Sequence, residues 1–153
     1  MQNNNRRSDR RMLIILLIIG MLSFAGAVSA TTLTTGSAVV TAINDTATFD
    51  LVLDVVPAGL SGYNLTVDLR GTPGIGRITR VNYPSWVEVS RNTTLPGDYV
   101  YLKGSAITAA VPDGSTNVKL ATITIEGLAE GSTPVNVTIV KMSDGLGTRM
   151  SPT

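Results

Sequence analysis

Hydrophobic and polar residues alternate with a period of two along several stretches of the chain. Phe49 to Val55 reads FDLVLDV, and Tyr63 to Leu69 reads YNLTVDL. The same alternation recurs over residues 121–126 and 135–139. Because successive side chains of a β-strand point to opposite faces, each stretch predicts a strand with one buried and one solvent-facing side.

Weaker alternation predicts further strands near residues 37–43, 77–82, 86–90 and 99–103, whereas residues 144–153 show no strand pattern. Short segments rich in Pro, Gly, Asn and Asp separate these stretches, and such residues suit tight turns. No window shows the period near 3.6 that is typical of a helix. The pattern therefore predicts an all-β fold, an antiparallel sandwich of two sheets.

The first thirty residues follow a different pattern. Four arginines within residues 6–11 precede an uncharged apolar run over residues 12–28, and Val28-Ser29-Ala30 places small residues where a signal peptidase cuts. This layout predicts a helical signal peptide over residues 1–30 and an exported domain over residues 31–153, secreted or attached to the cell surface. The alternative is an uncleaved membrane anchor, since the apolar run is just long enough for a short bilayer span.

Charge and composition exclude several classes of function. The whole chain carries a net charge of +1, but residues 31–153 hold three Lys and five Arg against ten Asp and Glu, which leaves −2. This balance provides no basic surface for nucleic acid. The chain has no Cys and no His, so it lacks thiol chemistry, the commonest general base and the commonest metal ligand. We expect no cofactor and no metal ion.

The carboxylates do not form an obvious catalytic set. Asp50 and Asp54 share one strand face but lie about 13 Å apart, at roughly 3.3 Å per residue, too far for the acid pair of a glycoside hydrolase. The turns at residues 113–115 and 143–145 lack the spaced oxygen ligands of a calcium loop. The sequence therefore predicts a protein that is not an enzyme.

Residues 33–140 resemble a cohesin module. The resemblance is carried by Gly59-Leu60-Ser61-Gly62-Tyr63 entering a strand, by Tyr83-Pro84-Ser85-Trp86 after the next strand, and by Leu120-Ala121-Thr122-Ile123 leading to Glu130-Gly131-Ser132. It implies a jelly-roll β-sandwich, similar in fold to some carbohydrate-binding modules, and a role in binding. Two departures stand out: Arg70-Gly71-Thr72-Pro73 replaces a Tyr-Asp-Pro-like corner, and the expected domain over residues 31–153 lacks the closing strand of the family.

Cohesins capture dockerin modules through one sheet face, so the resemblance also implies a partner-binding surface. Asn64, Thr66 and Asp68 lie on the outward side of the strand over residues 63–69, and Tyr99 and Tyr101 lie on the strand expected beside it. The partner would be a dockerin-like protein module in an extracellular or cell-surface assembly. No membrane contact is expected except through an uncleaved N-terminal segment.

A carbohydrate-binding or structural cell-surface domain is the alternative function, with a polysaccharide as the partner. Trp86 is then the candidate sugar platform, since aromatic rings stack on pyranose faces. The same residue also suits a tryptophan that caps the core at one end of the sandwich.

Asn-x-Ser/Thr triplets are more frequent in residues 31–153 than their Asn content explains, and they begin at Asn44, Asn64, Asn92 and Asn136. They are candidate N-glycosylation sites, although Asn and Thr also suit turns and exposed strand positions. A glycan on Asn64 would occupy the face that a dockerin needs. Docking, glycosylation and a plain solvated face remain open for this strand.

Overall fold

The computed structural model describes residues 31–35, 39–40, 42–108 and 110–152, and these residues form strands, turns and loops. The predicted signal peptide and its cleavage site lie outside the described residues. In the part of the chain that is described, no helix is long and apolar enough to cross a membrane.

The strands follow one another along the chain with short connections. They are β1 (Leu33–Thr35), β2 (Val39–Val40), β3 (Thr46–Val56), β4 (Gly62–Asp68), β5 (Gly76–Asn82), β6 (Val89–Asn92), β7 (Tyr99–Ser105), β8 (Ser115–Gly127), β9 (Gly131–Ser132), β10 (Asn136–Ser143) and β11 (Arg149–Met150).

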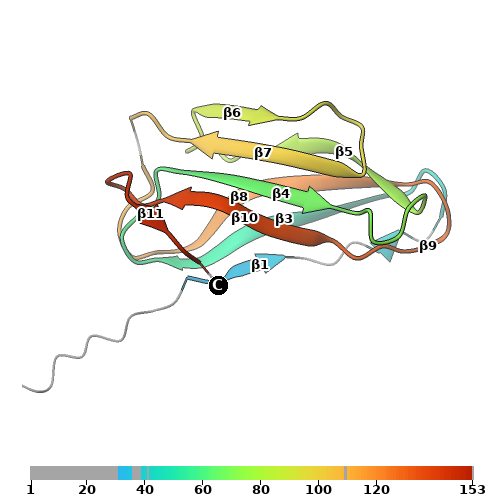
Figure 1. Cartoon of the computed structure of the whole chain (residues 1–153), viewed down its shortest axis with the longest axis horizontal. Helices are drawn as coiled ribbons and strands as arrows, with labels where there is room; N and C mark the ends of the chain where they lie inside the picture. Colours follow the sequence, from blue (N-terminus) through green and yellow to red (C-terminus); the bar gives the residue numbers. More distant parts are fainter. Residues whose placement is uncertain (1–30, 36–38, 41, 109, 153) are drawn as a thin grey trace, which may run out of the picture.

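Two antiparallel sheets face each other (Figure 1). The four-stranded sheet has the order β1-β3-β8-β5, and the five-stranded sheet has the order β11-β10-β4-β7-β6, while β2 pairs with β9. Figure 1 shows the long strands of both sheets running along the long axis of the domain. The predicted all-β, two-sheet antiparallel fold is confirmed.

The core lies between the two sheets and follows the period-two pattern. On β4, Tyr63, Leu65 and Val67 are buried, whereas the residues between them are only half-buried on the outer side. Burying one such apolar side chain stabilises the fold by about 1.5–3 kcal/mol. The largest fully buried side chains are Leu51, Leu53, Val56, Leu60, Leu65, Leu69, Ile78, Leu102, Leu120, Ile123, Ile125 and Met142.

Tyr63 ties the two sheets together. Its hydroxyl donates a hydrogen bond to the backbone carbonyl of Leu120 on β8, and its ring meets Trp86 edge-on at a centroid distance of 5.9 Å. Burial raises the pKa of the Tyr63 hydroxyl. Gly104 lies directly opposite Tyr63 on β7, where an added Cβ would come within 2.6 Å of the tyrosine ring. A glycine is therefore required at position 104.

Two predictions about strand position are wrong. The strand expected over residues 86–90 begins only at Val89, because the Pro84 carbonyl accepts a hydrogen bond from Val87 and closes a turn that contains Trp86. Residues 144–153 contain strand β11, although no strand was predicted there. The Asp144 carboxylate accepts hydrogen bonds from two backbone N–H groups of this turn and brings β11 back to β10.

Candidate partner-binding face

The residues predicted to face a partner come together on the outer side of the five-stranded sheet. Thr66 lies opposite Tyr101, and Asp68 lies opposite Tyr99, in the antiparallel pairing of β4 with β7. Asn64 is the next outward residue of β4. Because directly opposed residues in a sheet share a face, the five side chains form one continuous surface, which we call the outer face.

Strand β10 extends the outer face on the other side of β4. Asn136 lies opposite Asp68, Thr138 lies opposite Thr66, and Lys141 lies opposite Asn64. These β10 residues are exposed. Sequence analysis named only Asn136 among them, as a glycosylation candidate, because it predicted the strand of Tyr99 and Tyr101 beside β4 but not the strand on the other side.

An ion pair and a cation–π contact hold the Asp68 end of the outer face. The Arg70 guanidinium donates to both carboxylate oxygens of Asp68, at 2.9 Å from Nε and 2.6 Å from Nη2, and the Arg70 backbone N–H donates at 2.8 Å. These hydrogen bonds lower the pKa of Asp68 to about 2. The guanidinium carbon also lies 4.6 Å from the centre of the Tyr99 ring. One side of that ring is therefore covered by a cation.

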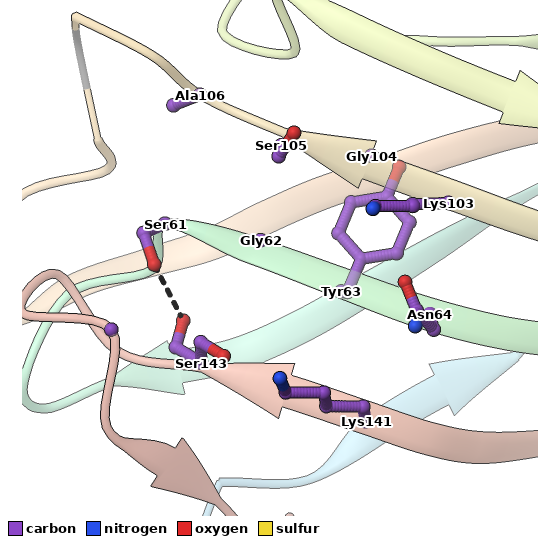
Figure 2. Close-up of a pocket in the computed structure, with 11 residues that line it drawn as sticks. Ser61, Gly62, Tyr63, Asn64, Lys103, Gly104, Ser105, Ala106, Lys141 and Ser143 are labelled. Atoms are coloured by element: carbon purple, nitrogen blue, oxygen red, sulfur yellow. Dashed lines mark hydrogen bonds between the residues drawn. The ribbon is translucent and has the colours of Figure 1, made fainter.

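An open pocket with a volume of about 280 Å³ lies at the Asn64 end of the outer face. Figure 2 shows Asn64 between the side chains of Lys103 and Lys141, with Ser61 and Ser143 farther along the pocket. The Ser61 hydroxyl donates to backbone carbonyls of the Ser143–Asp144 segment, which fixes the loop beside the pocket. The pocket is thus lined by amide, hydroxyl and ammonium groups.

Trp86, the candidate sugar platform, lies away from the outer face. Its indole N–H donates to the Lys119 carbonyl of β8 at 2.9 Å, and its ring packs against the core beside Tyr63. This arrangement agrees with a tryptophan that caps the core. Sugar stacking on Trp86 stays a prediction.

The four Asn-x-Thr sites lie in different surroundings. Asn44 is exposed in a turn with φ of 68°, Asn92 is exposed at the end of edge strand β6, and Asn136 is exposed at the start of β10. Asn64 is half-buried in a central strand between two lysines. Within the described residues, no group of three or more His, Cys, Asp or Glu side chains is placed to hold a metal ion.

Comparison with known proteins rests on structure. No protein-family model matches the sequence, and no curated protein matches it. A non-cellulosomal cohesin from the hyperthermophilic archaeon Archaeoglobus fulgidus superposes with a TM-score of 0.62 at 14% identity, over 81% of this chain and 85% of that chain. The chain has a cohesin fold.

Two further structures with this cohesin fold are complexes. A chain of the CaDoc0917–CaCohA2 complex matches with a TM-score of 0.62 at 11% identity, over 80% of this chain and 92% of that chain. The sixth cohesin of scaffoldin B from Acetivibrio cellulolyticus, in complex with a mutant Cel5 dockerin, matches with a TM-score of 0.61 at 12% identity. The match covers 82% of this chain and 94% of that chain. The predicted resemblance to a cohesin module is confirmed at the level of the fold.

Proposed function

We propose that this domain is a non-catalytic binding module that docks a dockerin-like protein module on the outer face of its five-stranded sheet. The carrying observation is that face itself, where Asn64, Thr66 and Asp68 lie beside two tyrosines on a rigid sheet. Tyrosine combines large contact area with a polar hydroxyl, which is typical of protein interfaces. Two cohesin-fold neighbours are described as complexes with a dockerin, which supports the same class of partner here.

A matched pair of variants tests which sheet binds. Thr66 lies outward in the central strand β4, and Thr124 lies outward in β8, one of the two inner strands of the four-stranded sheet. Both are half-buried threonines, so replacing either with tryptophan adds the same neutral bulk, and tryptophan suits a strand.

Purified dockerin modules encoded by the same genome serve as ligands in isothermal titration calorimetry. We expect Thr66→Trp to weaken binding about tenfold or more and Thr124→Trp to change it less than about twofold, because a misfit at the centre of an interface is costly. Equal effects of the two variants, or no binding by any dockerin module, would contradict the proposal.

A carbohydrate-binding role is the second candidate, and Tyr101 on the outer face is the observation that favours it. The Tyr101 ring is half-buried on the solvent side of β7, so it offers a surface on which a sugar ring can stack. Pull-down with insoluble polysaccharide distinguishes the two roles. Retention that Tyr101→Ala abolishes, with no dockerin bound, would replace the docking proposal with this one.

We also propose that the domain works outside the cell, on the basis of the signal-like residues 1–30. Export is tested by N-terminal sequencing of the protein recovered from the medium or the cell surface, with a new terminus at Thr31 expected. Mass spectrometry of the same material tests glycosylation at Asn44, Asn92 and Asn136. A glycan on Asn64 would contradict docking on the outer face.

A further inference from the structure

A row of basic side chains crosses the outer face at its Asn64 end. Arg91 on β6 lies opposite Lys103 on β7, Lys103 lies opposite Asn64 on β4, and Asn64 lies opposite Lys141 on β10. Opposed residues share a face. We call Arg91, Lys103 and Lys141 the basic row. Neighbouring strands lie about 4.8 Å apart, so the backbone of the row spans about 14 Å.

A β-bulge places Lys141 in this row. Ile139 lies opposite Leu65, but the register shifts between Ile139 and Lys141, so Val140 is the extra residue. Strict alternation from Ile139 would turn Lys141 toward the core. With the bulge, Lys141 is exposed and Met142 is fully buried. Figure 2 shows the Lys141 and Lys103 side chains on opposite sides of Asn64.

The basic row has no carboxylate partner among the described residues. The ion pairs in the described part of the chain join Arg70 to Asp68, Arg77 to Glu126 and Lys119 to Asp50. None of them reaches the row.

Two loop carboxylates at the same end of the sheet are occupied by their own loops. Glu88 accepts hydrogen bonds from the backbone N–H groups of Ile107 and Thr108, and Asp144 accepts from those of Leu146 and Thr148. Like charges directly opposed across strands, as at Arg91 and Lys103, are destabilising. A ligand carboxylate placed over the row would relieve this repulsion.

We propose that the basic row receives acidic side chains of the protein partner, so the partner is negatively charged where it meets β6, β7, β4 and β10. That the partner is a protein rests on the proposed function. The backbones of Lys103 and Lys141 lie about 10 Å apart, because two strand spacings separate them. The partner therefore presents at least two carboxylates at a comparable separation. At the Asp68 end the charges are already paired, so the basic row sets the orientation of the partner.

Charge reversal tests the row, with Arg80 as the matched control. Arg80 is an exposed cation on β5 of the four-stranded sheet, so Arg80→Glu changes the net charge as much as Lys103→Glu or Lys141→Glu. The ligand is a dockerin module that the calorimetry has shown to bind.

Complementary charges act mainly on the association rate. We expect either lysine reversal to slow association about tenfold at low ionic strength, with little effect left in about 0.5 M salt, and Arg80→Glu to change it less than about twofold. If Thr66→Trp blocks binding but the lysine reversals behave like Arg80→Glu, this inference fails and the proposed function stands.

A second measurement does not depend on finding a dockerin. A peptide of alternating Glu and Ser is titrated into the full domain and followed by amide NMR, with an alternating Lys and Ser peptide as control. We expect the Glu peptide alone to shift Asn64, Lys103 and Lys141, and Lys103→Glu to abolish the shifts. Polygalacturonate binding the row more tightly than the Glu peptide would overturn the assignment to an acidic protein. If the Glu peptide shifts these amide signals but no dockerin module binds, the basic row is supported as a site for acidic side chains and the proposed docking of a dockerin fails.

Discussion

The outer faces of the two sheets distribute charge in different ways. On the four-stranded sheet, Lys119 lies 2.7 Å from the Asp50 carboxylate and Arg77 lies 3.1 Å from that of Glu126. On the five-stranded sheet, the Asp68–Arg70 pair occupies one end, while the basic row at the other end has no carboxylate partner within the described chain.

This difference concerns recognition more than stability. Exposed ion pairs typically contribute about 0–1 kcal/mol, so neither arrangement determines whether the core folds. On the four-stranded sheet, Arg80 is an exposed cation outside the two ion pairs. A row of neighbouring unpaired cations attracts carboxylates more strongly than a single one does. This difference supports the proposal that the five-stranded sheet is the face that meets a partner.

The largest expected effect comes from disturbing the close contact between Gly104 and Tyr63, which both line the pocket. In Gly104→Ala the new methyl group would lie 2.6 Å from the ring of Tyr63, and we expect the free energy of unfolding to fall by about 2–3 kcal/mol through overpacking. Urea denaturation measures the loss. Gly147→Ala is the control: its φ is 85° and nothing lies within 4 Å of the added carbon, so only about 1 kcal/mol of backbone strain is expected. Equal losses in the two variants would contradict this account of Gly104.

A smaller effect on the free energy of unfolding is expected when a paired charge, rather than an unpaired one, is removed. Asp50→Asn removes the ion pair with Lys119 and weakens the hydrogen bond from Thr122, so we expect unfolding to become easier by up to about 1 kcal/mol. Lys103→Met and Lys141→Met remove no ion pair and are expected to stay within about 0.5 kcal/mol of the parent. A loss in either lysine variant as large as that in Asp50→Asn would show that the basic row has a structural partner.

The smallest expected effect is a change in titration. Hydrogen bonds from Arg70 lower the pKa of Asp68 to about 2 in the folded domain, below the value of about 3.9 in an unfolded chain. The ionised carboxylate therefore favours folding fully above about pH 4, and this contribution is lost as the pH falls toward 2.

Carbon-13 NMR of the carboxyl groups measures the Asp68 pKa directly. Arg70→Met should raise it toward the ordinary value of 3.8. On the other sheet, hydrogen bonds from Lys119 and Thr122 lower the pKa of Asp50, which the Arg70 variant should leave unchanged. Titration of Asp68 near 3.8 in the parent domain would contradict the ion pair.

Sequence patterns predicted more of the central strands than of the edges. In β3 and β4 one side is buried, so alternation specifies which residues face inward, and the predicted Asn64, Thr66 and Asp68 are found on the outer side. All four residues of edge strand β6 are exposed. Since both of its faces meet solvent, its sequence carries no alternation, and the prediction placed it too early. The two-residue strand β11 is too short to show a period at all.

The sequence by itself determined the two-sheet architecture and the outward residues of β4 and β7, because a strand with one buried side must alternate apolar and polar residues. Only the tertiary structure decided that β10 flanks β4 and that β6 flanks β7, and hence that Arg91, Lys103 and Lys141 lie in one row. Strand pairing joins residues far apart in the chain, and the bulge at Val140 reverses the local alternation. The residues expected to recognise the charge of a partner are therefore set by long-range pairing.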